Sequence, residues 1–336
     1  MARVVRFHEL GDARVLRIDD LADEAPRPHE VRLKVAAIGL NRAEILWRMG
    51  RYLERPTLPA RIGYDAAGVV DAVGDQVEHV KVGDRVATMP LFSQQHHGVY
   101  GETATVPADA VTLYPTHLTP GEATTFGVQY MTVYFGLNRV GRLDAGQWLL
   151  ATAASSSTGI AAIEMGKAMG ARVIATTRTA AKKAVLAERG ADAVITTQEQ
   201  DLAAAAEKIT QGAGVDVAFD PVAGVMFEKI VQTMRPGGRI VIYGMLDSMP
   251  MTLDPLAVML KCISVTGFQV FNFTGSATFA AHPDAIEQAR QYIHAHLEDG
   301  SLRPLIARTF HGLEQIGEAQ DFMMSNQQIG KIVVEL

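Results

Sequence analysis

The chain has 336 residues, of which 48% are hydrophobic and 20% charged, as in a well-packed soluble protein of about two domains. Asp and Glu total 37 against 31 Lys and Arg, giving a net charge of -6, and there is no basic run. This balance argues against nucleic acid as a partner. We also expect no membrane association and a cytoplasmic location, because no apolar run is long enough to span a membrane and the N-terminus lacks a signal-peptide core.

The single cysteine, Cys262, excludes an intrachain disulfide and a four-cysteine zinc site. It lies in the apolar segment CISVTGF. Because free cysteines are usually buried, we expect Cys262 to be a buried thiol.

Residues 1 to about 120 carry short alternating apolar runs separated by Gly, Pro and Asp, a pattern typical of β-strands. The expected strands in this β-rich region include 4–7, 31–37, 68–73 and 85–88.

From about residue 121 to 267 the pattern changes to alternating helices and strands. The expected strands are 148–151, 172–175, 193–195, 215–219, 239–243 and 262–267, with helices from about Thr158 and over 201–210. Repeated βα units predict a doubly wound parallel sheet.

The last part of the chain leaves this pattern. Helices are expected over 283–297 and from Leu313, and a final strand over 331–334. A terminal strand with no domain of its own should join an existing sheet. We therefore predict that a domain of residues 121–267 is inserted between two parts, 1–120 and 268–336, of the other domain.

The turn after the strand at 148–151 is the first candidate for binding a cofactor. The three glycine positions of the dinucleotide fingerprint are here Ala154, Ser156 and Gly159. Small side chains let a pyrophosphate approach the backbone, and Ser155, Ser156, Ser157 and Thr158 offer hydroxyl donors. The alternative is that these hydroxyls only cap the following helix.

The end of the next strand distinguishes between two cofactors. A fold selective for NAD places an acidic residue there to bind the ribose 2'-hydroxyl, but this chain has Thr176-Thr177-Arg178, followed by Lys182. Positive charge at this point suits a 2'-phosphate. The sequence therefore predicts NADPH, with Thr177, Arg178 and Lys182 binding it; the alternative is an ordinary solvated face.

The order of these parts resembles the medium-chain dehydrogenase/reductase superfamily, nearly from end to end. Several motifs look like its zinc-free quinone oxidoreductase branch: Asn41 with Gly50-Arg51-Tyr52, residues 63–70 (GYDAAGVV), 82–86 (VGDRV), 220–224 (DPVAG) and 330–334 (GKIVV). The resemblance implies an α/β protein with a GroES-like catalytic domain and an inserted Rossmann domain. It also implies no metal, because Asn41 and Tyr64 stand where the zinc enzymes of the superfamily have cysteine and histidine.

The same resemblance implies roles for individual residues. Asn41, Tyr52 and Tyr64 would form the catalytic part of a cleft between the domains, where Tyr52 either donates a proton or only shapes the cleft, and Tyr64 either contributes chemically or fills space. The further cofactor contacts implied, besides Asn41, are Thr132, Thr197, Gly244, Phe268 and Lys331. Relatives often have tyrosine where Thr197 stands, so stacking of the adenine is not expected there.

The leading interpretation is an NADPH-dependent oxidoreductase that transfers hydride to a quinone or an α,β-unsaturated carbonyl. One alternative is an NADPH-dependent enoyl thioester reductase, for which Arg42, Arg48 and Arg51 could form a cationic path to the carrier's phosphates unless they are a solvated face. The other is a non-catalytic protein that binds or senses NADPH. The expected partners are a small-molecule substrate and a second copy of the chain. The resemblance implies pairing through the strand at 262–267, as in dimers of this family; the alternative is that this edge is covered.

Overall fold

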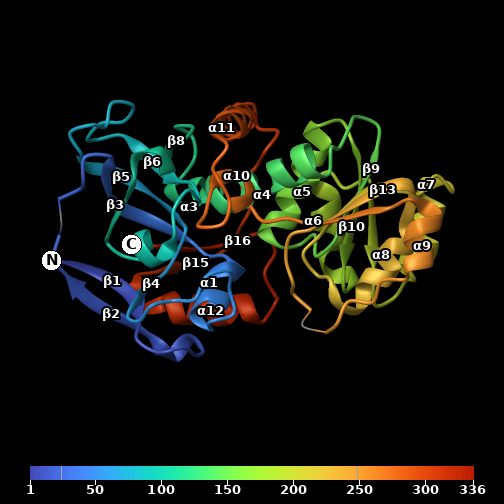
Figure 1. The fold of residues 1–336 in the computed structure, drawn as a ribbon, viewed down its shortest axis with the longest axis horizontal. Helices are drawn as coiled ribbons and strands as arrows, with labels where there is room; N and C mark the ends of the chain where they lie inside the picture. The colour runs from blue at the N-terminus through green and yellow to red at the C-terminus, as the bar shows by residue number, and fades with distance from the viewer. Residues whose placement is uncertain (24, 248) are drawn as a thin grey trace. The chain divides into compact units, whose positions relative to one another are not determined.

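The computed structural model describes residues 1–23, 25–247 and 249–336 (Figure 1). The chain divides into two compact units. Unit 1 contains Met1–Met131, Phe271–His294 and Pro304–Leu336, and unit 2 contains Thr132–Val270 and Ala295–Arg303. The functional domain limits given above stay a prediction.

Unit 1 is rich in β-structure. Its strands are β1 (Ala2–Phe7), β2 (Leu16–Leu21), β3 (Glu30–Gly39), β4 (Ala60–Arg61), β5 (Asp65–Val73), β6 (Arg85–Thr88), β7 (Thr103–Pro107), β8 (Val111–Leu113), β15 (Ile306–His311) and β16 (Lys331–Glu335). A seven-stranded sheet has the order β15-β16-β3-β5-β6-β8, with β7 also pairing with β3, and a three-stranded sheet has the order β2-β1-β4. The alternation of buried and exposed residues that predicted these strands is seen in β3, where Val31, Leu33 and Val35 face the core.

Short helices connect and cover these strands. They are η1 (Ala13–Val15), α1 (Arg42–Arg48), α2 (Gln94–His97), η2 (Ala108–Ala110), α3 (Pro120–Ala123), η3 (Phe126–Tyr130), α10 (Phe271–Thr274), η7 (Leu313–Gln315) and α12 (Ile316–Met324), together with most of α11 (Pro283–Glu298). The two helices expected after residue 280 are therefore present.

The final strand returns to the first part of the chain. Strand β16 pairs antiparallel with β3, with Val333 opposite Gly39 and Glu335 opposite Ala37. It also pairs in parallel with β15. This confirms the expectation that the terminal strand joins an existing sheet, and it brings Lys331 to the end of β3.

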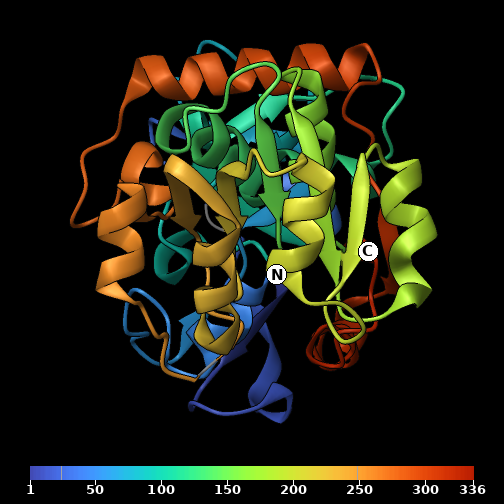
Figure 2. The same ribbon diagram turned by 90° about the vertical axis from the view of Figure 1, so that its right-hand side faces the viewer.

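Unit 2 is built on a six-stranded parallel sheet with the order β11-β10-β9-β12-β13-β14 (Figure 2). The strands are β9 (Trp148–Ala151), β10 (Arg172–Thr177), β11 (Ala193–Thr196), β12 (Val215–Asp220), β13 (Met234–Ile242) and β14 (Ser264–Gly267). The helices are α4 (Met131–Tyr134), η4 (Phe135–Val140), α5 (Ser157–Ala168), η5 (Ala180–Lys182), α6 (Lys183–Glu188), α7 (Leu202–Thr210), η6 (Gly224–Met226), α8 (Phe227–Thr233) and α9 (Pro255–Lys261). The predicted doubly wound parallel sheet is confirmed, and the strand order reverses between β9 and β12, where such folds bind ligands.

The helices that start beside this sheet begin at side-chain caps. Ser156 Oγ accepts a hydrogen bond from the backbone N–H of Gly159 at the start of α5, and Asp201 caps α7 through the N–H of Ala204. Such a cap satisfies one of the otherwise unpaired N–H groups of a first helical turn.

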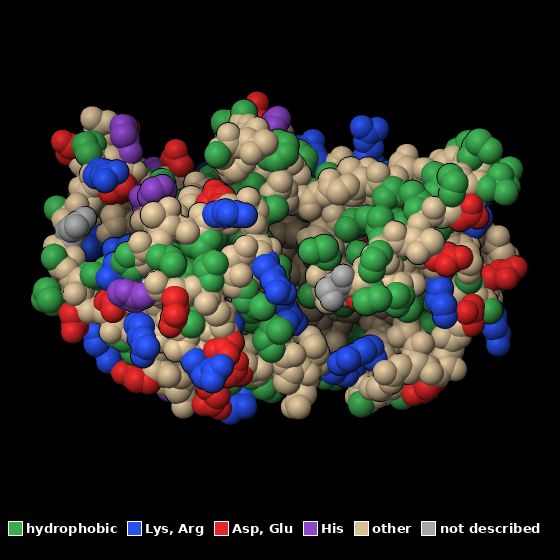
Figure 3. All heavy atoms as spheres, turned by 60° about the horizontal axis from the view of Figure 1, so that its bottom comes forward, with side chains coloured by type: hydrophobic (Ala, Val, Ile, Leu, Met, Phe, Trp, Pro, Cys, Tyr) green, Lys and Arg blue, Asp and Glu red, His purple; other side chains and the backbone are tan. Residues whose placement is uncertain are grey.

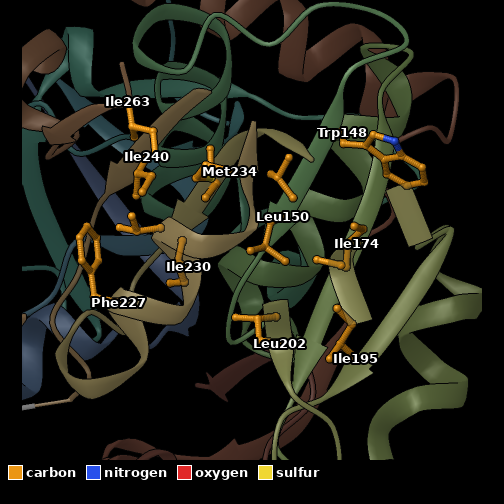
Figure 4. Close-up of a cluster of buried hydrophobic side chains, with 14 residues drawn as sticks. Trp148, Leu150, Ile174, Ile195, Leu202, Phe227, Ile230, Met234, Ile240 and Ile263 are labelled. Atoms are coloured by element: carbon orange, nitrogen blue, oxygen red, sulfur yellow. The ribbon is translucent and has the colours of Figure 1, made fainter. Parts of the chain in front are cut away.

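Apolar side chains from the strands and helices of unit 2 form its core (Figure 4). Leu150, Ile174, Ile195 and Ile240 from the sheet are fully buried, and Phe227 of α8 packs with them. A single large-to-small substitution in such a core typically costs about 2–5 kcal/mol. This core holds the carboxyl ends of β9, β10 and β12 in place.

The expectation for Cys262 is wrong, because its thiol is exposed. Cys262 ends α9 in the left-handed conformation, with φ 50°, and its neighbour Ile263 is the residue that packs into the core. The apolar segment is therefore buried on one side only. Among the described residues, no helix is long and apolar enough to cross a membrane.

Candidate active site

Asn41 precedes α1 in unit 1 and is held by Glu44, three residues further along the chain. The Asn41 backbone N–H donates to Glu44 Oε2 at 2.5 Å, and Asn41 Nδ2 donates to Glu44 Oε1 at 3.0 Å. An acidic residue at the third position of a helix commonly reaches back to the capping residue in this way. Asn41 is half-buried, whereas Glu44 is fully buried.

A buried ion pair lies beside Asn41. Lys331 Nζ is 2.6 Å from Asp65 Oδ2 and donates to Asn41 Oδ1 at 2.7 Å, and Asp65 Oδ2 also accepts from Asn41 Nδ2 at 2.9 Å. The side chains of Lys331 and Asp65 are fully buried. We call Asn41, Glu44, Asp65 and Lys331 the Asn41 cluster.

Within the Asn41 cluster, the pKa of the Glu44 carboxyl is shifted. Burial raises the pKa of its carboxyl to about 7, with a further rise from the Asp65 carboxylate, against the opposing effects of Asn41 and Lys331. A carboxyl in an apolar interior resists ionisation because its charge loses contact with water. Glu44 is therefore expected to change protonation state near neutral pH.

The Asn41 cluster does not fit a catalytic zinc ion. Asn41 Oδ1 and Asp65 Oδ2 already accept hydrogen bonds from Lys331, whose positive charge would repel a cation. Catalytic zinc normally takes three protein ligands, chiefly imidazole, thiolate or carboxylate. In the part of the chain that the structure describes, no group of three or more His, Cys, Asp or Glu side chains is arranged to hold a metal.

Two tyrosines predicted for the site lie in the same unit. Tyr64 is buried, and its ring packs against Phe92 at 5.8 Å and Phe271 at 5.5 Å between centroids. Tyr52 is half-buried, and its pKa is raised first by burial and then by the carboxylates of Glu44 and Glu54. Both hydroxyls therefore stay protonated at neutral pH, which makes them hydrogen-bond donors.

In unit 2, the turn between β9 and α5 has the shape of a phosphate-binding loop. A Cβ atom on Gly159 would lie 2.6 Å from Ala154 Cα, so only glycine permits this close packing of helix on strand. Positive φ in this turn falls on Ala153, at 46°, and not on Ala154 or Ser156. The side chains of Ser155, Ser157 and Thr158 are half-exposed, as a ligand-binding loop requires.

The cations after β10 are adjacent to this turn. Lys182 Nζ is 3.4 Å from Ser155 Oγ, and its pKa is lowered by burial and by the charge of Arg178. Arg178 is exposed and Thr177 is buried, with the Thr177 carbonyl accepting from the Thr197 N–H at 2.9 Å. A lysine whose charge is destabilised by a neighbouring cation favours an anion close by.

The remaining predicted contacts lie at separate points of unit 2. Thr132 is buried within α4, and Phe268 follows β14, with its N–H donating to the Ile242 carbonyl at 2.8 Å. Gly244 follows β13, where an added Cβ would lie 3.1 Å from Pro221. Whether these residues contact a cofactor stays a prediction.

Sequence reasoning missed two members of the Asn41 cluster and one buried acid in unit 2. The spacing of Asn41 and Glu44 is a capping pattern that could have identified Glu44. Asp65 stands out in the sequence only as part of a motif. Asp220, at the carboxyl end of β12, is fully buried, and it accepts from the Ala223 N–H at 2.8 Å and contacts Thr152 Oγ1.

Comparison with known proteins agrees with this architecture. A family model described as "Alcohol dehydrogenase GroES-like domain" matches residues 27–116, and one described as "Zinc-binding dehydrogenase" matches 157–288. The solved quinone oxidoreductase of Escherichia coli, complexed with NADPH, has a TM-score of 0.88 with full coverage of both chains. Its sequence identity is 24%, so this likeness establishes a common fold.

Several relatives match nearly the whole of this chain, among them the following two. The quinone oxidoreductase of Lama guanicoe is 30% identical over 100% of this chain and 98% of its own length. A phenolphthiocerol/phthiocerol polyketide synthase of Mycobacterium tuberculosis is 32% identical over 99% of this chain, which spans 15% of that much longer protein. The chain therefore belongs to the medium-chain dehydrogenase/reductase superfamily, in its quinone oxidoreductase-like branch.

Proposed function

We propose that this protein is an NADPH-dependent oxidoreductase that transfers a hydride to a quinone or an α,β-unsaturated carbonyl without a metal. The observation that carries the cofactor assignment is the pair Arg178 and Lys182, which replaces the acidic residue of NAD-selective folds and lies beside the turn that ends in Gly159. Membership of the quinone oxidoreductase-like branch supports the acceptor class.

The residues of unit 2 fit such a cofactor. The unpaired N–H groups of the first turn of α5 and the hydroxyls of Ser155, Ser157 and Thr158 would hold the pyrophosphate, while Arg178 and Lys182 would hold the 2'-phosphate. Bound NADPH would supply the hydride. Thr132, Thr197, Gly244 and Phe268 are proposed as its further contacts.

The acceptor explains why a metal is not needed. A quinone or an enone moves the incoming negative charge onto an oxygen atom, where hydrogen bonds and one proton donor suffice. Alcohol dehydrogenation instead requires strong stabilisation of an alkoxide, usually by a Lewis acid. The Lys331 ammonium group of the Asn41 cluster carries a positive charge, as a metal would, but it is buried and paired with Asp65.

An enoyl thioester reductase is the second candidate, favoured by the match to a polyketide synthase over 99% of the chain. The proposed cationic path does not support it. Arg48 is 2% exposed and hydrogen-bonds the Gly11 carbonyl and Gln320, and Arg42 donates to Asn326 Oδ1 at 2.7 Å. Only Arg51 of the three is exposed, so carrier phosphates find little free positive charge there.

One set of assays distinguishes these functions. NADPH oxidation is measured with a quinone, a short enone and an enoyl thioester at equal concentrations. Turnover of the quinone or the enone is expected to exceed that of the thioester. A preference for the thioester would favour the second candidate, and tight NADPH binding without oxidation by any acceptor would identify a non-catalytic binding protein.

Tyr52 is the proposed proton donor to the reduced substrate. We expect Tyr52→Phe to lower kcat for enone reduction by about 10²-fold, in the range typical of a lost general acid, with little change in NADPH affinity. Tyr114→Phe, a buried tyrosine of unit 1 that lies under the Arg85 guanidinium, is the control. Unchanged turnover in Tyr52→Phe would leave this residue a role in shape alone.

We further propose that the protein is a cytoplasmic homodimer formed through β14. This strand has one neighbour, β13, among the described residues, and the adjacent α9 exposes Leu256, Met259 and Leu260 by 54%, 67% and 72%. Hydrophobic side chains also gather in groups on the surface drawn in Figure 3. An open apolar edge of this kind favours pairing with another strand.

A further inference from the structure

The carboxylate of Asp220 joins two loops at the carboxyl edge of the sheet in unit 2. Asp220 ends β12 and is fully buried. Its Oδ1 atom accepts from the Val222 N–H at 3.1 Å and from the Thr152 hydroxyl, and its Oδ2 atom accepts from the Ala223 N–H at 2.8 Å. Thr152 directly follows β9 and begins the turn to α5, whereas Val222 and Ala223 belong to the loop after β12. The two loops therefore flank the point where the strand order reverses.

Each of these loops contains an alanine with a positive φ. Ala153 has a φ of 46°, and Ala223 has a φ of 56° with a ψ of −135°. A residue with a Cβ atom disfavours this backbone conformation, which glycine adopts freely. The other described non-glycine residues with positive φ end or follow helices, where such a conformation is common. Strain of this kind persists only where neighbouring contacts enforce it, so the contacts of these two alanines are informative.

Hydrogen bonds next to each alanine hold it in the strained conformation. Asp220 accepts from the Ala223 N–H, and the Asp247 N–H donates to the carbonyl of the preceding residue at 3.0 Å. In the other loop, Thr152 precedes Ala153, and its hydroxyl donates to the same Asp220 carboxylate. Asp220 is thus in contact with both loops at or beside the strained residue.

We propose that Asp220 is a positioning residue that holds both loops in the conformation that binds a dinucleotide, so that this part of the site is formed before the cofactor enters. The inference rests on the proposed function and concerns unit 2 alone. A protein whose binding-competent conformation is only partly populated binds its ligand more weakly in proportion. Asp220 should therefore support the binding of NADPH and NADH alike, because the two cofactors differ only in the 2'-phosphate.

Asp220→Asn tests this role with almost no change in side-chain shape. A carboxamide has an NH₂ group in place of one carboxylate oxygen, so either the Val222 or the Ala223 N–H would face a donor instead of an acceptor. Calorimetry should show that the affinities for NADPH and NADH both fall by about tenfold, since one hydrogen bond to a charged group is lost from the binding conformation. Thr152→Val removes only the link to the other loop and should lower both affinities in the same direction.

Asp216→Asn is the matched control, because Asp216 joins the same two strands at their other end. Asp216 Oδ2 accepts from the Trp148 N–H at 2.7 Å, where β12 and β9 begin. This variant should lose stability in urea as Asp220→Asn does, but it should keep the nucleotide affinities of the wild type. Wild-type affinities in Asp220→Asn, or equal losses of affinity in the two variants, would overturn the proposal.

The strain at Ala223 allows a test by rescue. In Asp220→Asn the loop can relax to a negative φ, and the cofactor must then restore the strained conformation. Glycine takes a positive φ without this cost, so D220N/A223G should regain most of the lost affinity. Ala223→Gly alone should change the affinity little, because Asp220 already holds the loop. An affinity of D220N/A223G no higher than that of Asp220→Asn would overturn the role assigned to Asp220.

A further measurement needs no ligand. Hydrogen exchange of the Val222 and Ala223 amides in the unliganded protein should be slow in the wild type and about tenfold faster in Asp220→Asn, because local opening exposes these groups to water. Equal exchange rates in the two proteins would overturn the positioning role. A wild-type protein that binds both nucleotides but oxidises no NADPH would count against the proposed function alone.

Discussion

Replacing Arg178 and Lys182 together with alanine is expected to weaken NADPH binding by about 10²- to 10⁴-fold and to leave NADH binding nearly unchanged. Each charge-assisted hydrogen bond contributes about 1.5–3 kcal/mol, or roughly 10- to 100-fold in affinity. NADH lacks the 2'-phosphate that these two side chains are proposed to bind, so it has no such interaction to lose.

Titration calorimetry of both nucleotides at one fixed ionic strength measures this effect, because salt screens exposed charges. Arg172→Ala is the control, since Arg172 is an exposed cation at the opposite end of the same strand β10 and contacts the Gly146 carbonyl. Equal losses for NADPH and NADH would place the two cations outside the 2'-phosphate site. A large loss in the Arg172 control would indicate a nonspecific effect of net charge.

The second large effect concerns pH and Glu44. Its pKa is about 7 in the folded protein against an ordinary value of 4.5. From pH 4.5 upward the unfolded chain releases this proton while the folded protein keeps it, so the contribution of Glu44 to the stability of the wild type falls until the pH passes about 7. The total loss is about 3 kcal/mol, at roughly 1.4 kcal/mol for each pH unit.

Glu44→Gln lacks the titrating group and should not show this loss. Urea unfolding of both proteins from pH 4 to 8 should give a stability difference that changes by about 3 kcal/mol in favour of the variant as the pH rises. Glu102→Gln is the control, because the Glu102 side chain is 43% exposed and hydrogen bonds from Arg3 lower its pKa. Parallel stability curves for wild type and Glu44→Gln would contradict the assignment.

The fold could be predicted well because local patterns determine much of it. Four consecutive apolar or small residues predicted β9 with its observed bounds, Trp148–Ala151. Ser156 caps α5 one residue before its start at Ser157, close to the predicted Thr158. The repeated βα units left few alternatives to a doubly wound sheet.

The candidate site was less predictable because its contacts join distant parts of the chain. Lys331 and Asn41 are 290 residues apart, and no local pattern relates them. Cys262 shows the same limit in another way, because hydrophobic neighbours do not say which side chains face the core where a helix ends before an edge strand. Asn41 was expected to help chemically, but its hydrogen bonds depend on Asp65 and Lys331, whose positions come from the tertiary fold.

The position of β16 has a consequence for synthesis on the ribosome. Strand β3 is made nearly 300 residues before Lys331, so during translation its edge stays open where β16 will later pair. Open strand edges attract other chains and contacts of long sequence separation form slowly. The nascent chain should therefore need protection, from a chaperone or by early folding of unit 2, until β16 arrives and completes the sheet.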